Sequence, residues 1–131
     1  MKPEDYFKNG KIFVWKETFA VIKSKNPLSN SFAVIKDKNK ITVVIDQSKV
    51  NENSIDIIKI EKGWRLITFD MELPFELVGF LAKISGALAE KNISIFVISS
   101  YSTDHILVKE TDLDSALKQL GELGFVISNG S

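Results

Sequence analysis

Apolar residues in the second half of the chain recur at the spacing of an α-helix. One set lies at positions i, i+4, i+7 and i+11, which share a single helix face: Leu77, Leu81, Ile84 and Leu88. Pro74 suits the first turn of such a helix, because its missing N–H needs no partner there, and Asn92 suits a left-handed residue at the end. The pattern predicts a helix over about 75–91.

Further apolar patterns on both sides of this helix complete one βαββαβ unit. "EKGWRLITFDM" precedes it as a strand, and "ISIFVISS" follows as a nearly continuous apolar run, typical of a strand buried on both faces. "HILVKE" predicts a returning strand, and a second helix opens with Thr111 and Asp114 at capping-box spacing and closes on Gly124, before a last strand at "FVIS". This order, over about 63–128, predicts a ferredoxin-like α+β sandwich.

The first half of the chain predicts strands with little room for helices. "FAVIK" occurs at 19–23 and again at 32–36, "KITVVID" follows the second copy, and "DIIKI" makes a fourth strand at 56–60. The segments where helices would stand allow only a turn or two, so this half is interpreted as a degenerate βαββαβ unit. The sequence thus predicts two units, 1–62 and 63–131, joined by a short "EKG" linker at 61–63.

Composition and charge narrow the classes of function. The 131 residues carry 17 basic and 17 acidic side chains, so no bulk field attracts the chain to nucleic acid or an anionic membrane. There is no cysteine and one histidine, so disulfides, thiolate nucleophiles and multi-histidine metal centres are not expected, nor is any cofactor. No segment reaches the roughly 18 apolar residues that a membrane helix requires. We expect a cytoplasmic protein without a membrane or nucleic-acid partner.

A polar stretch between two strands, residues 99–105, gathers serine, threonine, aspartate and the single histidine. As a catalytic centre it is disfavoured, because nucleophile, base and orienting acid must converge from different directions, and neighbours on a hairpin tip do not. The simplest alternative is a set of turn hydrogen bonds, with His105 a partly exposed strand residue. A third interpretation makes this stretch one wall of a ligand site.

The ligand hypothesis uses the loop "DMELPFELVG", which leads into the first predicted helix. A helix N-terminus presents free N–H groups to a carboxylate, while Asp104, Glu72 or Glu76 is suited to an ammonium group. Those are the two ends of an α-amino acid. Gly79, inside the first helical region, either lets a ligand approach the backbone or packs closely against a strand. Carboxylates near a helix start are also favourable without any ligand.

A nucleic-acid function is a competing interpretation, since RNA-binding modules share this order of strands and helices. Such modules stack bases on aromatic residues of the central strands, with basic residues nearby. Here the best central-strand candidate, "ISIFVISS", offers Phe96 and no basic residue. The sequence therefore gives this interpretation little support.

The second half of the chain closely resembles the ACT-domain subgroup of small bacterial and archaeal proteins. Those proteins are related to the C-terminal ACT region of aspartate kinases and to the cytosolic arginine sensors of animal cells. The resemblance is carried by the glycine pattern at 79–82, by "ALAE" at 87–90 and by "ISSYSTDHILV" at 98–108. The first half is similar in outline only, as a helix-poor ACT unit of a tandem pair.

This resemblance implies a regulatory module that binds an amino acid where two ACT units meet, and not an enzyme. Relatives use the loop into the first helix, the helical glycine and the turn after the second strand. The corresponding residues here are Glu72, Pro74, Phe75, Glu76, Gly79, Ser100, Tyr101 and Asp104. Ser100 stands where related sites often have threonine. The nearby carboxylates favour a cationic amino acid such as arginine or lysine.

The resemblance and the exposed edges of the predicted sheets also predict a homodimer. No catalytic domain is recognised in these residues, so regulation is expected to act on a separate, unidentified protein. The competing hypothesis is an ACT-fold protein–protein interaction module that has lost its ligand. Gly79 and Asp104 would serve packing and hairpin roles in that case.

Overall fold

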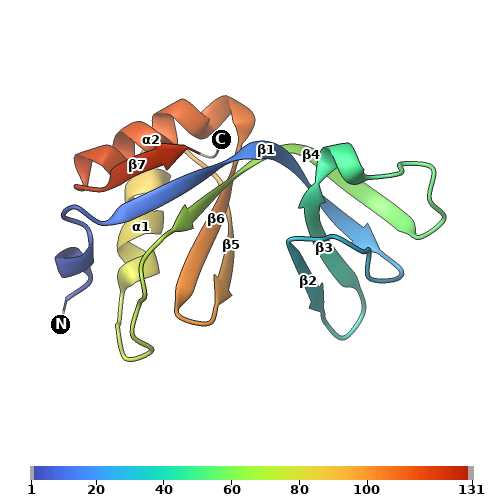
Figure 1. Cartoon of the computed structure of the whole chain (residues 1–131), viewed down its shortest axis with the longest axis horizontal. Helices are drawn as coiled ribbons and strands as arrows, with labels where there is room; N and C mark the ends of the chain where they lie inside the picture. Colours follow the sequence, from blue (N-terminus) through green and yellow to red (C-terminus); the bar gives the residue numbers. More distant parts are fainter. Residues whose placement is uncertain (1, 130–131) are drawn as a thin grey trace. The chain divides into compact units, whose positions relative to one another are not determined.

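The computed structural model describes residues 2–129 and has an α+β architecture (Figure 1). Within residues 2–129, two α-helices, three short 3-10 helices and seven strands follow one another. Their bounds are η1 (Pro3–Tyr6), β1 (Lys11–Ser24), β2 (Ala33–Lys36), β3 (Ile41–Asp46), η2 (Gln47–Lys49), β4 (Ile57–Phe69), α1 (Phe80–Ala89), β5 (Ile95–Ser100), β6 (Thr103–Lys109), η3 (Glu110–Asp112), α2 (Leu113–Glu122) and β7 (Val126–Asn129). The α+β class predicted from the sequence is confirmed.

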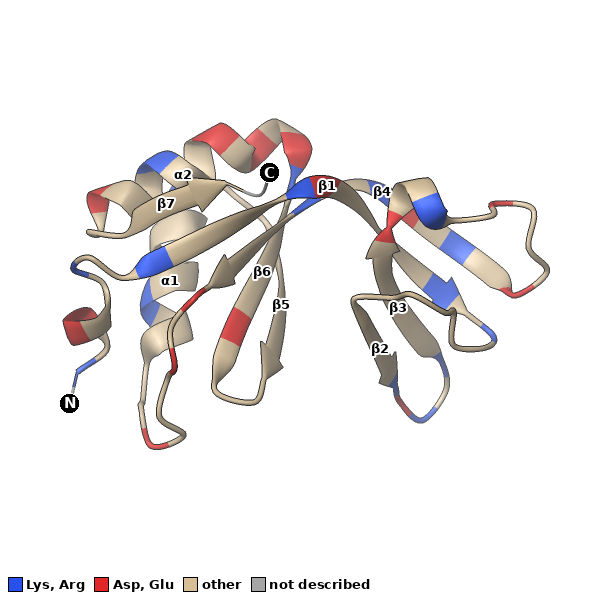
Figure 2. Ribbon diagram, viewed as in Figure 1, with Lys and Arg blue, Asp and Glu red and all other residues tan. Residues whose placement is uncertain are grey.

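Charged side chains are spread over helices, strands and loops (Figure 2). Both signs occur together on β1, β4, β6 and α2, and the whole sequence carries 17 acidic and 17 basic residues. The charges that matter for a ligand are therefore local ones, set by which side chains line a pocket.

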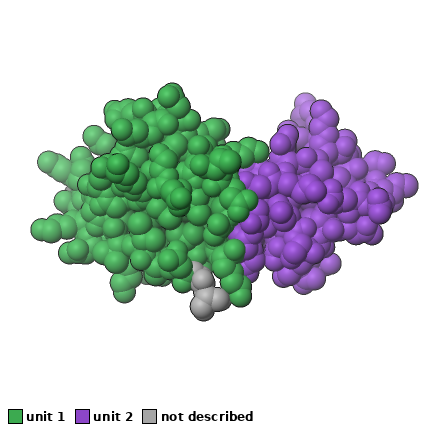
Figure 3. All heavy atoms as spheres, turned by 90° about the horizontal axis from the view of Figure 1, so that it is seen from above, with its two compact units in different colours: residues 1–16, 65–131 green, residues 17–64 purple. Residues whose placement is uncertain are grey.

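The chain forms two compact units (Figure 3). Unit 1 contains residues 1–16 and 65–131, and unit 2 contains residues 17–64. This grouping differs from the predicted division at 62 and 63, because the first 16 residues lie with the C-terminal part of the chain. The "EKG" segment is not a linker, since it lies inside the continuous strand β4.

The sheet of unit 1 contains the predicted βαββαβ unit with one additional strand. The strand order is β5, β6, β4, β1, with β7 beside β1, so the N-terminal strand takes a place between β4 and β7. β7 runs parallel to β1, with Ile12 opposite Ile127, and β6 is antiparallel to β5. The sequence patterns predicted β4 to β7 but did not predict this insertion, because periodicity carries no information on which strands pair.

One prediction about β5 was wrong. "ISIFVISS" was expected to be buried on both faces, but β5 is an edge strand of the sheet and 40% of Val97 is exposed. A short apolar run does not distinguish a central strand from an edge strand that is partly covered by a helix.

The core of unit 1 lies between its sheet and the two helices. It contains apolar residues from every layer, among them Ile67, Phe69, Ile84, Leu88, Ile106 and Leu120, all completely buried. Phe69 contacts Phe80 and Phe125 in edge-to-face geometry, each at a centroid distance of 5.4 Å. These contacts hold the start of α1 against the sheet.

Helix α1 begins later than the periodicity predicted. It starts at Phe80, after Gly79 at φ 88°, a left-handed conformation that cannot continue into a preceding helical turn. Pro74 is consequently in the loop and not in the first turn. The prediction that Asn92 adopts a left-handed conformation at the end of this helix is confirmed: α1 ends at Ala89, and Asn92 has a φ of 60° just beyond it.

Helix α2 also differs from the prediction at its start. A 3-10 turn, η3, precedes it, and no side chain caps its N-terminus, so the capping box between Thr111 and Asp114 does not form. Gly124 ends the helix as predicted, with a φ of 113°. Unit 2 has the expected strands in the order β2, β3, β1, β4, and its only helical turn is η2.

Candidate functional site

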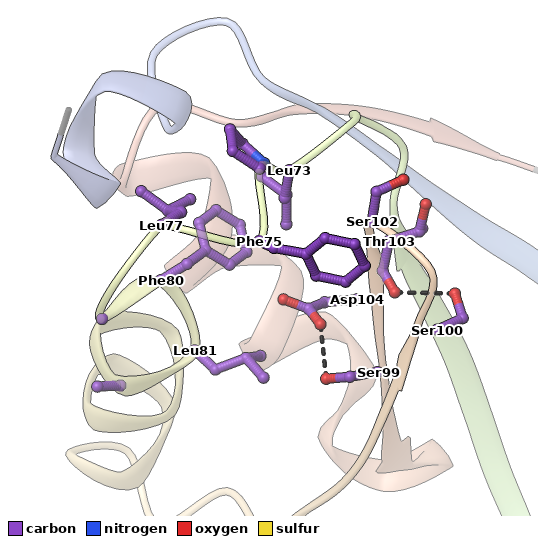
Figure 4. Close-up of a pocket in the computed structure, with 13 residues that line it drawn as sticks. Leu73, Phe75, Leu77, Phe80, Leu81, Ser99, Ser100, Ser102, Thr103 and Asp104 are labelled. Carbon is purple, nitrogen blue, oxygen red and sulfur yellow. Dashed lines mark hydrogen bonds between the residues drawn. The ribbon is translucent and has the colours of Figure 1, made fainter.

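A pocket of about 370 Å³ lies in unit 1 beside the turn between β5 and β6 (Figure 4). The loop 70–79 and the first turn of α1 form one side, and the β5–β6 hairpin forms the other. We call it the hairpin pocket; its lining residues are Leu73, Pro74, Phe75, Leu77, Gly79, Phe80, Leu81, Ala82, Ser99, Ser100, Ser102, Thr103 and Asp104.

Asp104 is the only ionisable residue in this lining. The antiparallel register places it opposite Ser99, so both side chains are on the same face of the hairpin. Ser99 Oγ donates a hydrogen bond of 2.7 Å to Asp104 Oδ1 (Figure 4). The carboxylate keeps further acceptor sites, so this wall is suited to a group with positive charge and N–H donors.

The facing side contains the N-terminus of α1. The first amide bonded within the helix is that of Lys83, which donates to the carbonyl of Gly79, and no side chain caps the preceding N–H groups in the described part of the chain. Such groups, with the positive end of the helix dipole, favour an anion. A Cβ on Gly79 would meet only Pro3 Cγ, at 3.7 Å, so its positive φ, and not crowding, requires glycine.

Five of the eight residues implied by the resemblance line this pocket. They are Pro74, Phe75, Gly79, Ser100 and Asp104. The other three, Glu72, Glu76 and Tyr101, are outside the lining, although Tyr101 contacts Phe75 edge-to-face at 4.9 Å. Without the two glutamates, the negative charge of the pocket comes from Asp104 alone.

Sequence reasoning missed most of the apolar wall and several hydroxyl groups of the hairpin. Leu73, Leu77 and Leu81 line the pocket, and the Leu73 N–H donates to the carbonyl of Ser102 at 2.8 Å, which ties the loop to the turn. Ser99 could have been found, because alternation along two paired strands places it on the same face as Asp104.

His105 is buried, with 8% of its surface exposed, whereas the sequence predicted a partly exposed residue. Its Nδ1 lies 2.8 Å from Thr68 Oγ1 and its Nε2 lies 3.1 Å from Ser100 Oγ. Neighbouring residues of a strand point to opposite faces, so His105 and Asp104 do not converge on one substrate atom. The hairpin therefore has no catalytic triad.

The protonation of His105 predicts a dependence of stability on pH. Burial lowers the pKa of His105 below its ordinary value of 6.5, and the Coulombic effect of Asp104 opposes this only in part. The unfolded chain then binds the proton more tightly than the folded chain does. The contribution of His105 to the free energy of unfolding is therefore fully present above pH 6.5, and it is lost as the pH decreases through the lower pKa of the folded state.

We expect urea unfolding to show a free energy that decreases from pH 7 to pH 5, and the decrease to be smaller in His105→Gln. Because His105 is the only histidine, the difference between the two profiles isolates its contribution. Identical profiles would contradict the lowered pKa. NMR titration of the single imidazole gives the folded pKa directly.

The described residues are compatible with neither a clustered metal site nor a membrane-spanning helix. No cluster of three or more histidine, cysteine, aspartate or glutamate side chains is arranged to hold a metal ion among residues 2–129. Over the same residues, none of the helices combines the length and apolar character needed to cross a bilayer.

Comparison with known proteins gives matches in sequence and in structure. Residues 59–122 match the family model of the ACT domain. The human protein named cytosolic arginine sensor for mTORC1 subunit 1 is 30% identical over 84 residues, which cover 61% of this chain and 26% of that protein. The chain thus spans about a quarter of the length of this relative.

Two solved structures share the fold over most of the chain. A protein from Agobacterium tumefaciens has a TM-score of 0.79 at 17% identity, covering 94% of this chain and 95% of that one. The regulatory subunit of aspartate kinase from Thermus thermophilus has a TM-score of 0.64 at 8% identity, covering 86% and 95%. Residues 59–122 thus match the ACT-domain family model, and the chain shares the fold of this regulatory subunit.

Proposed function

We propose that unit 1 binds a free cationic amino acid in the hairpin pocket. One observation carries the proposal: the only charged lining residue, Asp104, lies on the wall opposite the uncapped N-terminus of α1. A carboxylate favours the cationic end of the ligand, and free helix N–H groups favour its carboxylate. ACT domains are amino-acid-binding regulatory modules, which supports this assignment.

The apolar wall is suited to the aliphatic part of such a ligand. Leu73, Leu77 and Leu81 lie on it, and about 370 Å³ is within the range of small-molecule pockets. Arginine and lysine combine an aliphatic stem with a cationic end. The relative named as an arginine sensor makes L-arginine the first ligand to test.

We further propose that a second copy of the chain closes the pocket in a homodimer. Phe75, Val78 and Tyr101 are 72%, 81% and 81% exposed, and Phe75 belongs to the pocket lining. Covering such apolar surface favours association. A ligand that contacts both copies would stabilise the dimer, and regulation of a separate protein would follow from that shift. This role involves no catalysis.

A thermal-shift panel against the twenty amino acids tests this proposal. A ligand at 100 times its Kd stabilises the fold by about 2.7 kcal/mol, which raises Tm by several degrees. We expect arginine or lysine to give the largest rise. Agmatine, which is arginine without its carboxylate, and norvaline, which lacks the guanidinium, should each give a smaller one.

A panel without any rise would contradict the proposal and favour the ligand-free interaction module instead. Equal shifts for arginine and agmatine would show that the helix N-terminus does not bind the ligand carboxylate. All compounds are compared as chloride salts at one ionic strength, so that general screening does not imitate binding.

A further inference from the structure

A chain of hydrogen bonds crosses four neighbouring strands of unit 1 and ends at the β5–β6 turn. Trp15 Nε1 of β1 donates to Thr68 Oγ1 of β4 at 2.8 Å. Thr68 Oγ1 lies 2.8 Å from His105 Nδ1 of β6, and His105 Nε2 lies 3.1 Å from Ser100 Oγ of β5. Ser100 Oγ donates to the carbonyl of Thr103 at 2.9 Å.

The two ends of this chain determine the direction of every hydrogen bond in it. An indole N–H only donates and a backbone carbonyl only accepts. The single hydroxyl proton of Ser100 is used on Thr103, so His105 Nε2 must carry a proton and donate to Ser100. In the neutral ring, Nδ1 then accepts from the Thr68 hydroxyl, which itself accepts from Trp15. In the opposite tautomer, with the proton on Nδ1, neither His105 Nε2 nor Ser100 Oγ would have a hydrogen to place between them.

This chain of hydrogen bonds reaches the turn on the face of the hairpin opposite the side chains of Ser99 and Asp104. The register pairs Ser99 with Asp104, and the next pair along, Ser100 with Thr103, directs its side chains to the other face, although both residues also border the pocket. His105 lies on that other face, and it is not part of the pocket lining. The hydrogen bonds of His105 therefore hold the hairpin on the face opposite the Asp104 side chain.

The turn itself needs such support. Ser102 has a φ of 55°, a left-handed conformation that is uncommon for a residue other than glycine. The same residue accepts the hydrogen bond of 2.8 Å from the Leu73 N–H, so its position also sets the opposite loop of the pocket. A displaced turn would move both Asp104 and Leu73.

We infer that His105 is a positioning residue for the hairpin pocket, which acts by donating from Nε2 to Ser100 and so holds the β5–β6 turn in its binding geometry. The inference deepens the proposed function and rests on it for the effect on ligand affinity. His105, the only histidine of the chain, thereby has a role in binding although it does not line the pocket.

A matched pair of substitutions separates this role from simple packing. The amide nitrogen of Gln can take the place of His Nε2, whereas that of Asn reaches only the place of Nδ1. With L-arginine as the probe in titration calorimetry, we expect His105→Asn to raise Kd about fivefold, the loss of one hydrogen bond, and His105→Gln to stay within about twofold of the wild type.

A double-mutant cycle tests whether the effect passes through Ser100. In the Ser100→Ala background, His105→Asn should weaken L-arginine binding no further. Ser31→Ala is the control, because Ser31 closes another turn, by donating to the Leu28 carbonyl at 2.6 Å in unit 2, and its loss should leave Kd unchanged. Equal weakening by Asn and Gln, or an undiminished effect of Asn without Ser100, would overturn the inference.

Hydrogen exchange of the free protein provides a test that needs no ligand. We expect the backbone amides of 101–103 to exchange faster in His105→Asn and at the wild-type rate in His105→Gln. Absence of any amino-acid binding to the wild type would refute the proposed function, while the exchange comparison still decides whether His105 holds the turn. Unchanged exchange in both variants would refute the positioning role even where L-arginine binds.

Discussion

Replacement of Asp104 by asparagine is expected to weaken the binding of L-arginine about 30-fold, because a hydrogen bond to a charged group contributes about 2 kcal/mol. The amide oxygen still accepts from Ser99, so the hairpin is retained and only the charge is lost. Asp104 is the single ionisable residue of the pocket lining, and no neighbouring carboxylate there replaces it. Titration calorimetry of the wild type and the variant measures the change.

The chain contains two matched controls for this experiment. Like Asp104→Asn, the substitutions Glu72→Gln and Glu76→Gln each remove one negative charge. These two residues are in the loop before α1, and neither lines the pocket. Both variants should bind L-arginine within about twofold of the wild type, since charges exposed to water contribute little. If all three variants lost affinity equally, the general charge of the loop, and not Asp104, would explain binding.

The largest expected loss of stability follows from Phe69→Ala, at about 3–5 kcal/mol. Phe69 is completely buried and contacts Phe80 and Phe125, so truncation leaves a cavity between β4, the start of α1 and the residue that precedes β7. Urea unfolding measures the difference in the free energy of unfolding. Because Phe80 lines the hairpin pocket, the variant should also bind L-arginine less tightly.

Phe75→Ala is the control for stability, since it removes the same side chain from a position that is 72% exposed. Its free energy of unfolding should stay within about 0.5 kcal/mol of the wild type, as for most surface substitutions. A loss for Phe69→Ala no greater than that for Phe75→Ala would show that the aromatic cluster does not hold unit 1 together.

Local patterns in the sequence were sufficient to predict most elements of the fold. The periodicity of Leu81, Ile84 and Leu88 predicted α1, and the strands from β4 to β7 were recognised from short apolar runs between polar turns. Asn92 and Gly124 could be predicted at helix ends because these residue types tolerate the positive φ that ends a helix, which needs no distant contact. Asp104 and Gly79 were selected from local chemistry, and both line the hairpin pocket.

What the sequence by itself determined is therefore the α+β class, the order of elements and the polar chemistry of one hairpin. The tertiary structure decided which strands pair, with β1 between β4 and β7, where α1 begins, and that Glu72 and Glu76 are outside the pocket while Ser99 is inside it. It also decided the burial of His105, through contacts with Thr68 and Ser100. The physical reason is that periodicity and turn chemistry act within a few residues, whereas these features depend on contacts between residues far apart in the chain.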